Sequence, residues 1–305
     1  MKFLLISLIT TYALTVNAST NSTRVVYGED NRKDLFEVTN PLYLKLAKST
    51  AAMVKKEYLR DNGDSYSSRI GANLEDGLGV CPSERFADQP LLSNCSGFLV
   101  GKDTIITAGH CYNGDYERLC EESVWVFDYK MADHKSINLT SIQKSNVYKC
   151  KSVVKQVLNG NEDFAVIKLQ KEVSGREPLK YRKTGKISND AKLVVIGHPS
   201  MMPLKVSGGG TVLRNYDRFQ FTTTLDTFQG NSGSAVFDSE TGLLEGILVS
   251  GKTDYIPSIE NNPQSCKVVN TCDMQGNNCD GTDRGSLAVP GENVTRITTV
   301  HKFIK

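Results

Sequence analysis

The chain has 305 residues, and its 36 Lys and Arg against 34 Asp and Glu give a net charge of +2. So balanced a charge predicts no strong attraction to nucleic acid or to an anionic surface. We therefore look for function in local motifs, and expect protein or peptide partners rather than nucleic acid.

The first segment, Met1–Ala18, has the features of a secretory signal peptide. Lys2 precedes an apolar run from Phe3 to Val16, and small residues follow at the end. A membrane anchor is the alternative, but the run is shorter than the roughly 20 residues that span a bilayer. No later stretch is long and apolar enough to span. We expect an exported chain, secreted or periplasmic, that is monomeric and not attached to a membrane once mature.

Residues 19–40 are polar and are expected to be a leader or pro-segment. Arg24 followed by Val25 is a candidate processing point, and an unremoved flexible leader is the alternative. The peptidase-like remainder would then span residues 41–305.

Eight cysteines agree with export. An even number in an exported chain favours disulfides over thiolate metal ligands, and there is no Cys-x-x-Cys pair to indicate zinc. We expect no metal and no cofactor. The cysteines are Cys81, Cys95, Cys111, Cys120, Cys150, Cys266, Cys272 and Cys279.

Most of the chain is predicted to be β-structure. Apolar residues over 42–59 have partly helical spacing, and 60–90 read as surface loop. Short runs rich in β-branched and aromatic residues then follow, separated by turn signals. They are 98–100, 104–107, 124–127, 153–157, 164–169, 192–196, 210–213, 218–223, 235–237 and 246–249, with a closing helix over 294–304. This pattern predicts an all-β fold of two Greek-key antiparallel barrels, about 41–185 and about 186–305.

Ser232 lies in the stretch DTFQGNSGS, residues 226–234. Flanking glycines let the backbone turn tightly and present the hydroxyl without a neighbouring Cβ. Taken alone, the stretch also fits a surface turn. A serine hydroxyl becomes a good nucleophile only when a base takes its proton.

Two upstream motifs contain the partners that such a serine needs. His110 follows an apolar strand and a small-residue turn, and histidine has the pKa of a base at neutral pH. Asp163 precedes FAVIKL, which alternates as a half-buried strand. Asp128 and Asp133 are alternatives for the acid. The remaining histidines, at positions 134, 198 and 301, have no such surroundings and are expected to be structural or solvated.

The order His110, Asp163, Ser232 and the sequences around these residues resemble the trypsin/chymotrypsin clan of serine endopeptidases, over about residues 90–300. The branch with the V8-like glutamyl endopeptidases also reads Gly-Asn-Ser-Gly-Ser. The resemblance implies a chymotrypsin-like fold, a catalytic triad, and an oxyanion hole formed by the amides of Gly230 and Ser232. It also implies an early strand near 49–54 and a Cys95–Cys111 disulfide. The other six cysteines allow 15 pairings, of which Cys120–Cys150 is the favoured one.

The resemblance also bears on activation and specificity. Asn231 stands where many relatives have an aspartate that pairs with the new amino terminus, so activation by that ion pair is not expected. Asp226 lies six residues before Ser232. In trypsin-like enzymes this position is the floor of the primary specificity pocket, and an aspartate there selects Lys or Arg. Thr227 matches a threonine with which glutamyl endopeptidases bind an acidic substrate, but those enzymes need a histidine on the strand ending at Gly251, which has none. We expect cleavage after Lys or Arg, with Asp226, Thr227 and Gly251 binding substrate. In the alternative, Asp226 only binds loop amides, and the enzyme prefers acidic or apolar residues.

Two other classes of protein are weighed against the peptidase. The first is an inactive binding or regulatory protein on the same fold, because fold alone does not determine function; the intact triad and Gly230 favour the enzyme. An α/β-hydrolase esterase is disfavoured, because its triad order differs and Ser234 replaces the second glycine of Gly-x-Ser-x-Gly. A calcium site in the polar loop at 273–283 is disfavoured, because the spacing matches no known calcium loop.

Overall fold

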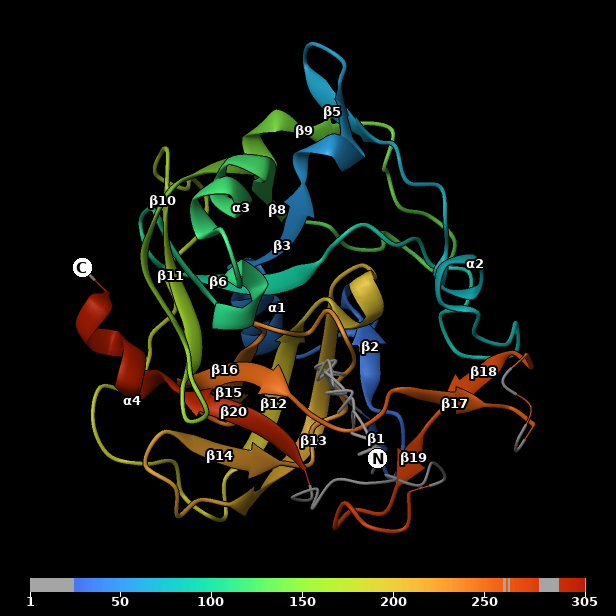
Figure 1. Ribbon diagram of the computed structural model, residues 1–305, viewed down its shortest axis with the longest axis vertical. Helices are drawn as coiled ribbons and strands as arrows, with labels where there is room; N and C mark the ends of the chain where they lie inside the picture. The colour runs from blue at the N-terminus through green and yellow to red at the C-terminus, as the bar shows by residue number, and fades with distance from the viewer. Residues whose placement is uncertain (1–24, 260–261, 263, 280–290, 305) are drawn as a thin grey trace, which may run out of the picture.

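The computed structural model describes residues 25–259, 262, 264–279 and 291–304. Two closed antiparallel six-stranded barrels make up most of this part of the chain, as the sequence predicted (Figure 1). Barrel one has the strand order β10-β11-β7-β6-β3-β8. Its strands are β3 (Thr50–Lys55), β6 (Cys95–Gly101), β7 (Thr104–Thr107), β8 (Ser123–Phe127), β10 (Val147–Leu158) and β11 (Asp163–Leu169).

Barrel two has the order β12-β15-β16-β20-β14-β13 and closes through pairing of β12 with β13. Its strands are β12 (Lys192–Gly197), β13 (Lys205–Arg214), β14 (Gln220–Thr223), β15 (Ala235–Asp238), β16 (Leu244–Ser250) and β20 (Glu292–Arg296). In both barrels β-branched and aromatic residues fill the strands, as expected for side chains packed on a pleated, largely buried surface.

Short elements connect and cover the barrels. The remaining strands are β1 (Val26–Tyr27), β2 (Arg32–Asp34), β4 (Leu59–Asp61), β5 (Ser65–Ser68), β9 (Ile142–Gln143), β17 (Tyr255–Pro257), β18 (Lys267–Val269) and β19 (Thr271–Cys272). The α-helices are α1 (Pro41–Ala47), α2 (Leu74–Leu78), α3 (Tyr116–Glu122) and α4 (Ile297–Val300). Single 3-10 turns are η1 (Leu35–Glu37), η2 (Lys56–Tyr58), η3 (Gly109–Tyr112), η4 (Lys144–Asn146), η5 (Pro199–Met201) and η6 (His301–Phe303).

Two local predictions are changed by the structure. The ambiguous segment 42–59 contains both elements, helix α1 and then strand β3, because Asn40 caps the helix by accepting a hydrogen bond from the amide of Leu42. The closing helix expected over 294–304 is wrong for its first residues, since Val294 to Arg296 complete strand β20. There, pairing with β14 and β16 provides the backbone hydrogen bonds that a helix would otherwise supply.

The two barrels share one hydrophobic core cluster. Phe98, Ile106 and Val166 of barrel one pack in the same cluster as Ile196 and Ile247 of barrel two. All of these side chains are fully buried. Burial of each stabilises the fold by roughly 1.5–3 kcal/mol, so the barrels are held against each other along the line where the candidate site lies.

Residues 25–40, which we expected to belong to a leader, are part of the fold. Val25 and Tyr27 are fully buried, strand β1 pairs in parallel with β19, and strand β2 extends the sheet of barrel two beside β13. The signal peptide expected at 1–18 lies outside the described residues.

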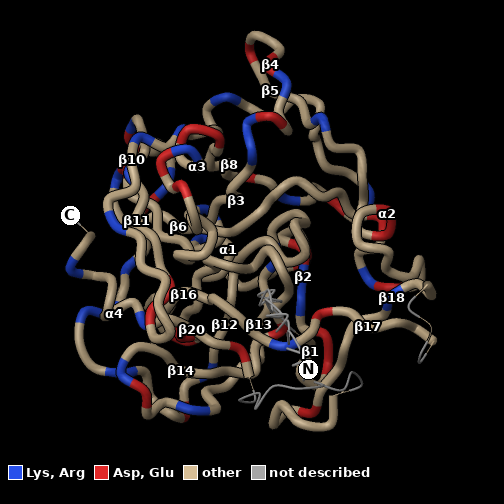
Figure 2. Tube along the Cα trace, in the orientation of Figure 1, with Lys and Arg blue, Asp and Glu red and all other residues tan. Residues whose placement is uncertain are grey.

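Four disulfides lie within the described residues. Cys95–Cys111 and Cys120–Cys150 agree with the expectation, and the other pairs are Cys81–Cys266 and Cys272–Cys279. Lys and Arg are interspersed with Asp and Glu along the trace, as the net charge suggested (Figure 2). None of the helices described is long and apolar enough to cross a membrane.

Candidate active site

His110, Asp163 and Ser232 meet between the barrels. His110 lies in turn η3 directly after strand β7, and Asp163 is the first residue of β11, which pairs with β7. The Nδ1 atom of His110 is 2.7 Å from Oδ2 of Asp163, and its Nε2 atom is 2.7 Å from Oγ of Ser232. The Cys95–Cys111 disulfide anchors the residue after His110 to strand β6.

The hydrogen bonds determine which nitrogen of His110 carries the proton. An ionised carboxylate only accepts, so Nδ1–H donates to Asp163 and Nε2 is left to accept from the hydroxyl of Ser232. The amide of His110 also donates to Oδ1 of Asp163 at 2.9 Å. One carboxylate oxygen thus holds the backbone of His110 and the other its ring, which leaves Nε2 facing the hydroxyl of Ser232.

The nucleophile loop is anchored to barrel one by Ser96. The amide of Ser96 donates to the carbonyl of Ser232 at 2.8 Å, and its hydroxyl donates to the carbonyl of Gly230 at 2.9 Å. The same hydroxyl accepts from the amide of His198 at 2.9 Å. Ser96 is fully buried, and nothing in the sequence pattern singled it out. Its position depends on β6 packing against a loop more than 130 residues away in the sequence.

The peptide before Gly230 has a defined direction. The carbonyl of Gln229 accepts a hydrogen bond from the amide of Ser200, so in this trans peptide the N–H of Gly230 points to the opposite side. Gly230 has φ of +96°, and a Cβ there would lie 2.7 Å from the carbonyl oxygen of His198. Only glycine fits this position.

Asp226 is held by the amino-terminal segment. Its Oδ1 accepts from the amide of Tyr27 at 2.8 Å and its Oδ2 from the amide of Asn31 at 2.7 Å. The side chain is 2% exposed, and burial raises the pKa of Asp226 to about 7, partly opposed by these two hydrogen bonds. The geometry matches the alternative reading, in which Asp226 binds loop amides, rather than the expected pocket floor.

Thr227 and Gly251 meet at a different acid, Glu292. The hydroxyl of Thr227 donates to Oε2 of Glu292, and the carboxylate packs directly on Gly251, where a Cβ would lie 1.8 Å from Oε2. Tyr27 Oη donates to Oε1 of Glu292 at 2.9 Å. Glu292 and Thr227 are both fully buried. Sequence reasoning missed Glu292, because it lies 60 residues after Ser232 on a strand with no motif of its own.

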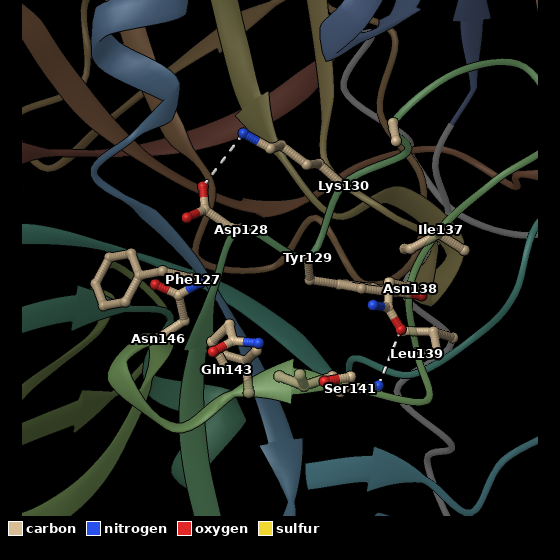
Figure 3. Close-up of a pocket in the computed structure, with 13 residues that line it drawn as sticks. Phe127, Asp128, Tyr129, Lys130, Ile137, Asn138, Leu139, Ser141, Gln143 and Asn146 are labelled. Carbon is tan, nitrogen blue, oxygen red and sulfur yellow. Dashed lines mark hydrogen bonds and ion pairs between the residues drawn. The ribbon is translucent and has the colours of Figure 1, made fainter. Parts of the chain in front are cut away.

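Two other places in the described residues gather polar side chains. A cavity of about 280 Å³ lies in barrel one, between β8 and the loop before β10, and is lined by Asp128, Tyr129 and Asn138 but by none of the three residues above (Figure 3). Asp128, an alternative for the acid, instead binds Arg176 at 2.8 Å. Asp273 of the polar loop accepts hydrogen bonds from neighbouring amides, and the loop's other acids lie outside the described residues.

The comparisons with known proteins agree with this geometry. A scan against protein-family models matches the trypsin-like peptidase domain over residues 95–247, about half of the chain. A search among curated proteins by sequence returns no match.

Three solved structures with a similar fold are the following. Vibrio cholerae VesB protease has 13% identity to this chain, covering 92% of this chain and 67% of its own, with a TM-score of 0.50. A Glu endopeptidase in complex with MPD has 18% identity, covering 92% of this chain and 97% of its own, with a TM-score of 0.49. Rv3671c from M. tuberculosis H37Rv, in an inactive form, has 12% identity, covering 92% and 95%, with a TM-score of 0.46.

Identities this low show a shared fold and no more. Membership of the family rests on the sequence match, which spans the segments that contain His110, Asp163 and Ser232. The chain belongs to the trypsin-like peptidase domain family and is a serine endopeptidase of the trypsin clan.

Proposed function

We propose that this endopeptidase is exported, hydrolyses peptide bonds through an acyl-enzyme on Ser232, and prefers Lys or Arg on the acyl side of the cleaved bond. The observation that carries the mechanism is His110, with one ring nitrogen 2.7 Å from Asp163 and the other 2.7 Å from Ser232. A bound substrate carbonyl would lie against Oγ of Ser232.

The reaction has two halves. Oγ of Ser232 attacks the carbonyl carbon while Nε2 of His110 takes the hydroxyl proton, which forms a tetrahedral oxyanion. His110 then gives that proton to the leaving amine nitrogen as the C–N bond breaks, and the acyl group remains as an ester on Ser232. Water attacks the ester with His110 again as base, and the acid product leaves with Ser232 reprotonated. Asp163 stabilises the imidazolium that forms in each half.

The amides of Gly230 and Ser232 are proposed to bind the oxyanion. Gly230 N–H is directed by the Gln229–Ser200 hydrogen bond, and the loop carrying both amides is anchored through Ser96. Donors fixed before the reaction stabilise the developing charge without reorganisation, and one such donor is worth about 10²–10³ in rate.

The mechanism is tested with Ser232→Ala. We expect peptide hydrolysis to fall by several orders of magnitude, on the order of 10⁶, while the fold and its unfolding midpoint are kept. The matched control is Ser152→Ala, at an exposed serine on β10, which should retain full activity. Near-normal turnover by Ser232→Ala refutes the mechanism.

Covalent labelling separates the enzyme from an inactive binding protein on the same fold. A fluorophosphonate reacts only with an activated serine, so we expect one label per chain, lost in both Ser232→Ala and His110→Ala. An unlabelled parent protein would favour the binding or regulatory alternative.

Export is supported by the four disulfides, which form and persist in oxidising compartments. We propose processing after Arg24, since Val25, the first residue that the structure describes, is completely buried. Sequencing the amino terminus of protein recovered outside the cytoplasm tests both points, with Val25 as the expected first residue. A mature protein that begins well after Val25 would contradict the burial of this segment.

A further inference from the structure

We propose, on the basis of the acyl-enzyme mechanism above, that Ser200 and Tyr255 are a pair of positioning residues that keep the amide of Gly230 directed at the oxyanion. Ser200 lies in turn η5 and Tyr255 begins strand β17. Contacts run without a break from Tyr255 through Ser200 to the peptide bond between Gln229 and Gly230.

The backbone of Ser200 fixes the direction of this peptide bond. Its amide donates a hydrogen bond to the carbonyl of Gln229, and the N–H of Gly230, across the same trans peptide, points the opposite way. A flipped peptide would exchange the two directions and place a carbonyl where the N–H now points. One oxyanion donor is worth about 10²–10³ in rate, so the direction of this peptide has a large effect on turnover.

Ser200 has a backbone conformation that serine rarely adopts. Its φ is +50° and its ψ is +31°, and the next residue, Met201, has φ of +66°. Left-handed residues other than glycine persist where surrounding contacts hold them, and they cluster at functional sites. Here the carbonyl of Met201 accepts from the amides of Leu92 at 3.0 Å and Ser93 at 3.3 Å. The turn is thus anchored with the amide of Ser200 facing Gln229.

The side chain of Ser200 is bound by Tyr255. The two hydroxyls are 2.8 Å apart and share a hydrogen bond, and Ser200 is fully buried. Burial raises the pKa of Tyr255 to about 12, so its hydroxyl keeps its proton at neutral pH. The ring of Tyr255 also packs against that of Phe228, the residue before Gln229, with centroids 5.3 Å apart. Tyr255 therefore supports both the turn and the nucleophile loop.

Gln229 is held on both sides from one short segment. Its amide donates to Oδ2 of Asp254 at 2.8 Å, and its carbonyl accepts from Ser200, to which Tyr255 is bound. Gly230 lets the turn approach, since a Cβ there would lie 2.7 Å from the amide nitrogen of Met201. These contacts fix the peptide groups before and after Gln229.

The segment that carries Asp254 and Tyr255 is braced at the edge of the molecule. Strand β17 pairs with β18, and the residue before β18 is Cys266, which forms the disulfide with Cys81. Figure 1 shows the two strands side by side at the right of the view. The ribbon of β17 and β18 thereby acquires a role in the site, through the single hydroxyl of Tyr255.

The test measures kcat and KM of Ser200→Ala, Tyr255→Phe and the double variant. We expect each single change to lower kcat about 3-fold to 10-fold with little change in KM, because the oxyanion forms only in the transition state. The double variant should be no slower than the slower single variant, since both changes remove the same hydrogen bond. Losses that multiply, or single variants with the kcat of the parent, would overturn the proposal.

Matched peptides with Arg, Leu or Glu before the cleaved bond separate this role from one in specificity. The fold-loss should be equal for every peptide that the parent cleaves, because the oxyanion forms on the main chain of each substrate. The matched control is Tyr43→Phe on α1, whose hydroxyl donates to the carbonyl of Ser239 at 3.3 Å and which should keep the kcat of the parent. A loss confined to one peptide would assign the pair to side-chain recognition and refute the proposal.

A second measurement distinguishes positioning from a merely structural role. Values of kcat are expressed per site labelled at the end of the fluorophosphonate reaction, so a loss of folded protein does not lower them. A peptide aldehyde forms a tetrahedral adduct with Ser232, and its Ki should rise by the factor by which kcat/KM falls. If Ser200→Ala does not fold, Ser200→Gly replaces it, because glycine adopts φ of +50° without strain.

An unchanged Ki for the aldehyde in the variants would refute the positioning role. Absence of Ser232-dependent hydrolysis in the parent would instead refute the proposed function above. The two failures are therefore distinguishable.

Discussion

Removal of the Cys81–Cys266 disulfide should be the most destabilising loss of any single bridge in this chain. The bridge joins the segment before β6 to the loop of barrel two that carries β17 and β18, across a sequence separation of 185 residues. The chain-entropy relation gives about 5 kcal/mol for a closed loop of this length and about 2 kcal/mol for the 7-residue separation of Cys272–Cys279. The predicted difference in unfolding free energy is therefore roughly 3 kcal/mol.

The assay is urea unfolding of two double variants, Cys81→Ala with Cys266→Ala and Cys272→Ala with Cys279→Ala. Both are made in the Ser232→Ala background, so that self-digestion does not distort the curves. With an m-value of about 3 kcal/mol/M, the first variant should unfold about 1 M lower in urea than the second. The backbone hydrogen bond from the amide of residue 81 to the carbonyl of Lys267 remains in both. If the first variant unfolds at the same or a higher urea concentration, loop closure does not explain the stabilisation.

Two further predictions concern residues beneath the nucleophile loop. Ser96→Ala removes the hydrogen bond to the Gly230 carbonyl, and we expect kcat to fall about 10-fold or more while KM changes little, because the oxyanion forms only in the transition state. A raised KM with unchanged kcat would contradict this positioning role. His198 is 1% exposed, and burial lowers its pKa to about 3, so the folded protein keeps it neutral while the unfolded chain takes up a proton below pH 6.5. The free energy of unfolding should therefore fall as the pH drops from 6.5 towards 3. Between pH 6.5 and 4, the free energy of unfolding of His198→Gln, measured by urea unfolding, should fall by roughly 3 kcal/mol less than that of the parent. Equal losses in the two proteins would show that another group is responsible.

The sequence alone was enough to predict the fold class and the three residues that meet at the candidate site. Barrel strands were visible because their β-branched and aromatic residues are contiguous and separated by turn signals, a local pattern. His110, Asp163 and Ser232 each stand in a short motif whose neighbours set the local backbone. The Cys95–Cys111 pair was also predicted, but only through the family resemblance.

Contacts between distant segments could not be predicted from local patterns. The helix expected from Val294 became a strand because β14 and β16 offered it hydrogen bonds. The leader expected up to residue 40 is packed into the fold from Val25 onwards, since Asp226, about 200 residues later, accepts amide hydrogen bonds from Tyr27 and Asn31.

The same limit applies to the acids around the nucleophile loop. Counting back from Ser232 led to Asp226, but the carboxylate beside Thr227 and Gly251 comes from Glu292 on another strand. Spacing along one loop describes only that loop, whereas its neighbours come from whichever strands the barrel brings beside it. Local sequence therefore determined which residues can do the chemistry, and barrel closure alone decided which acid lies beside them.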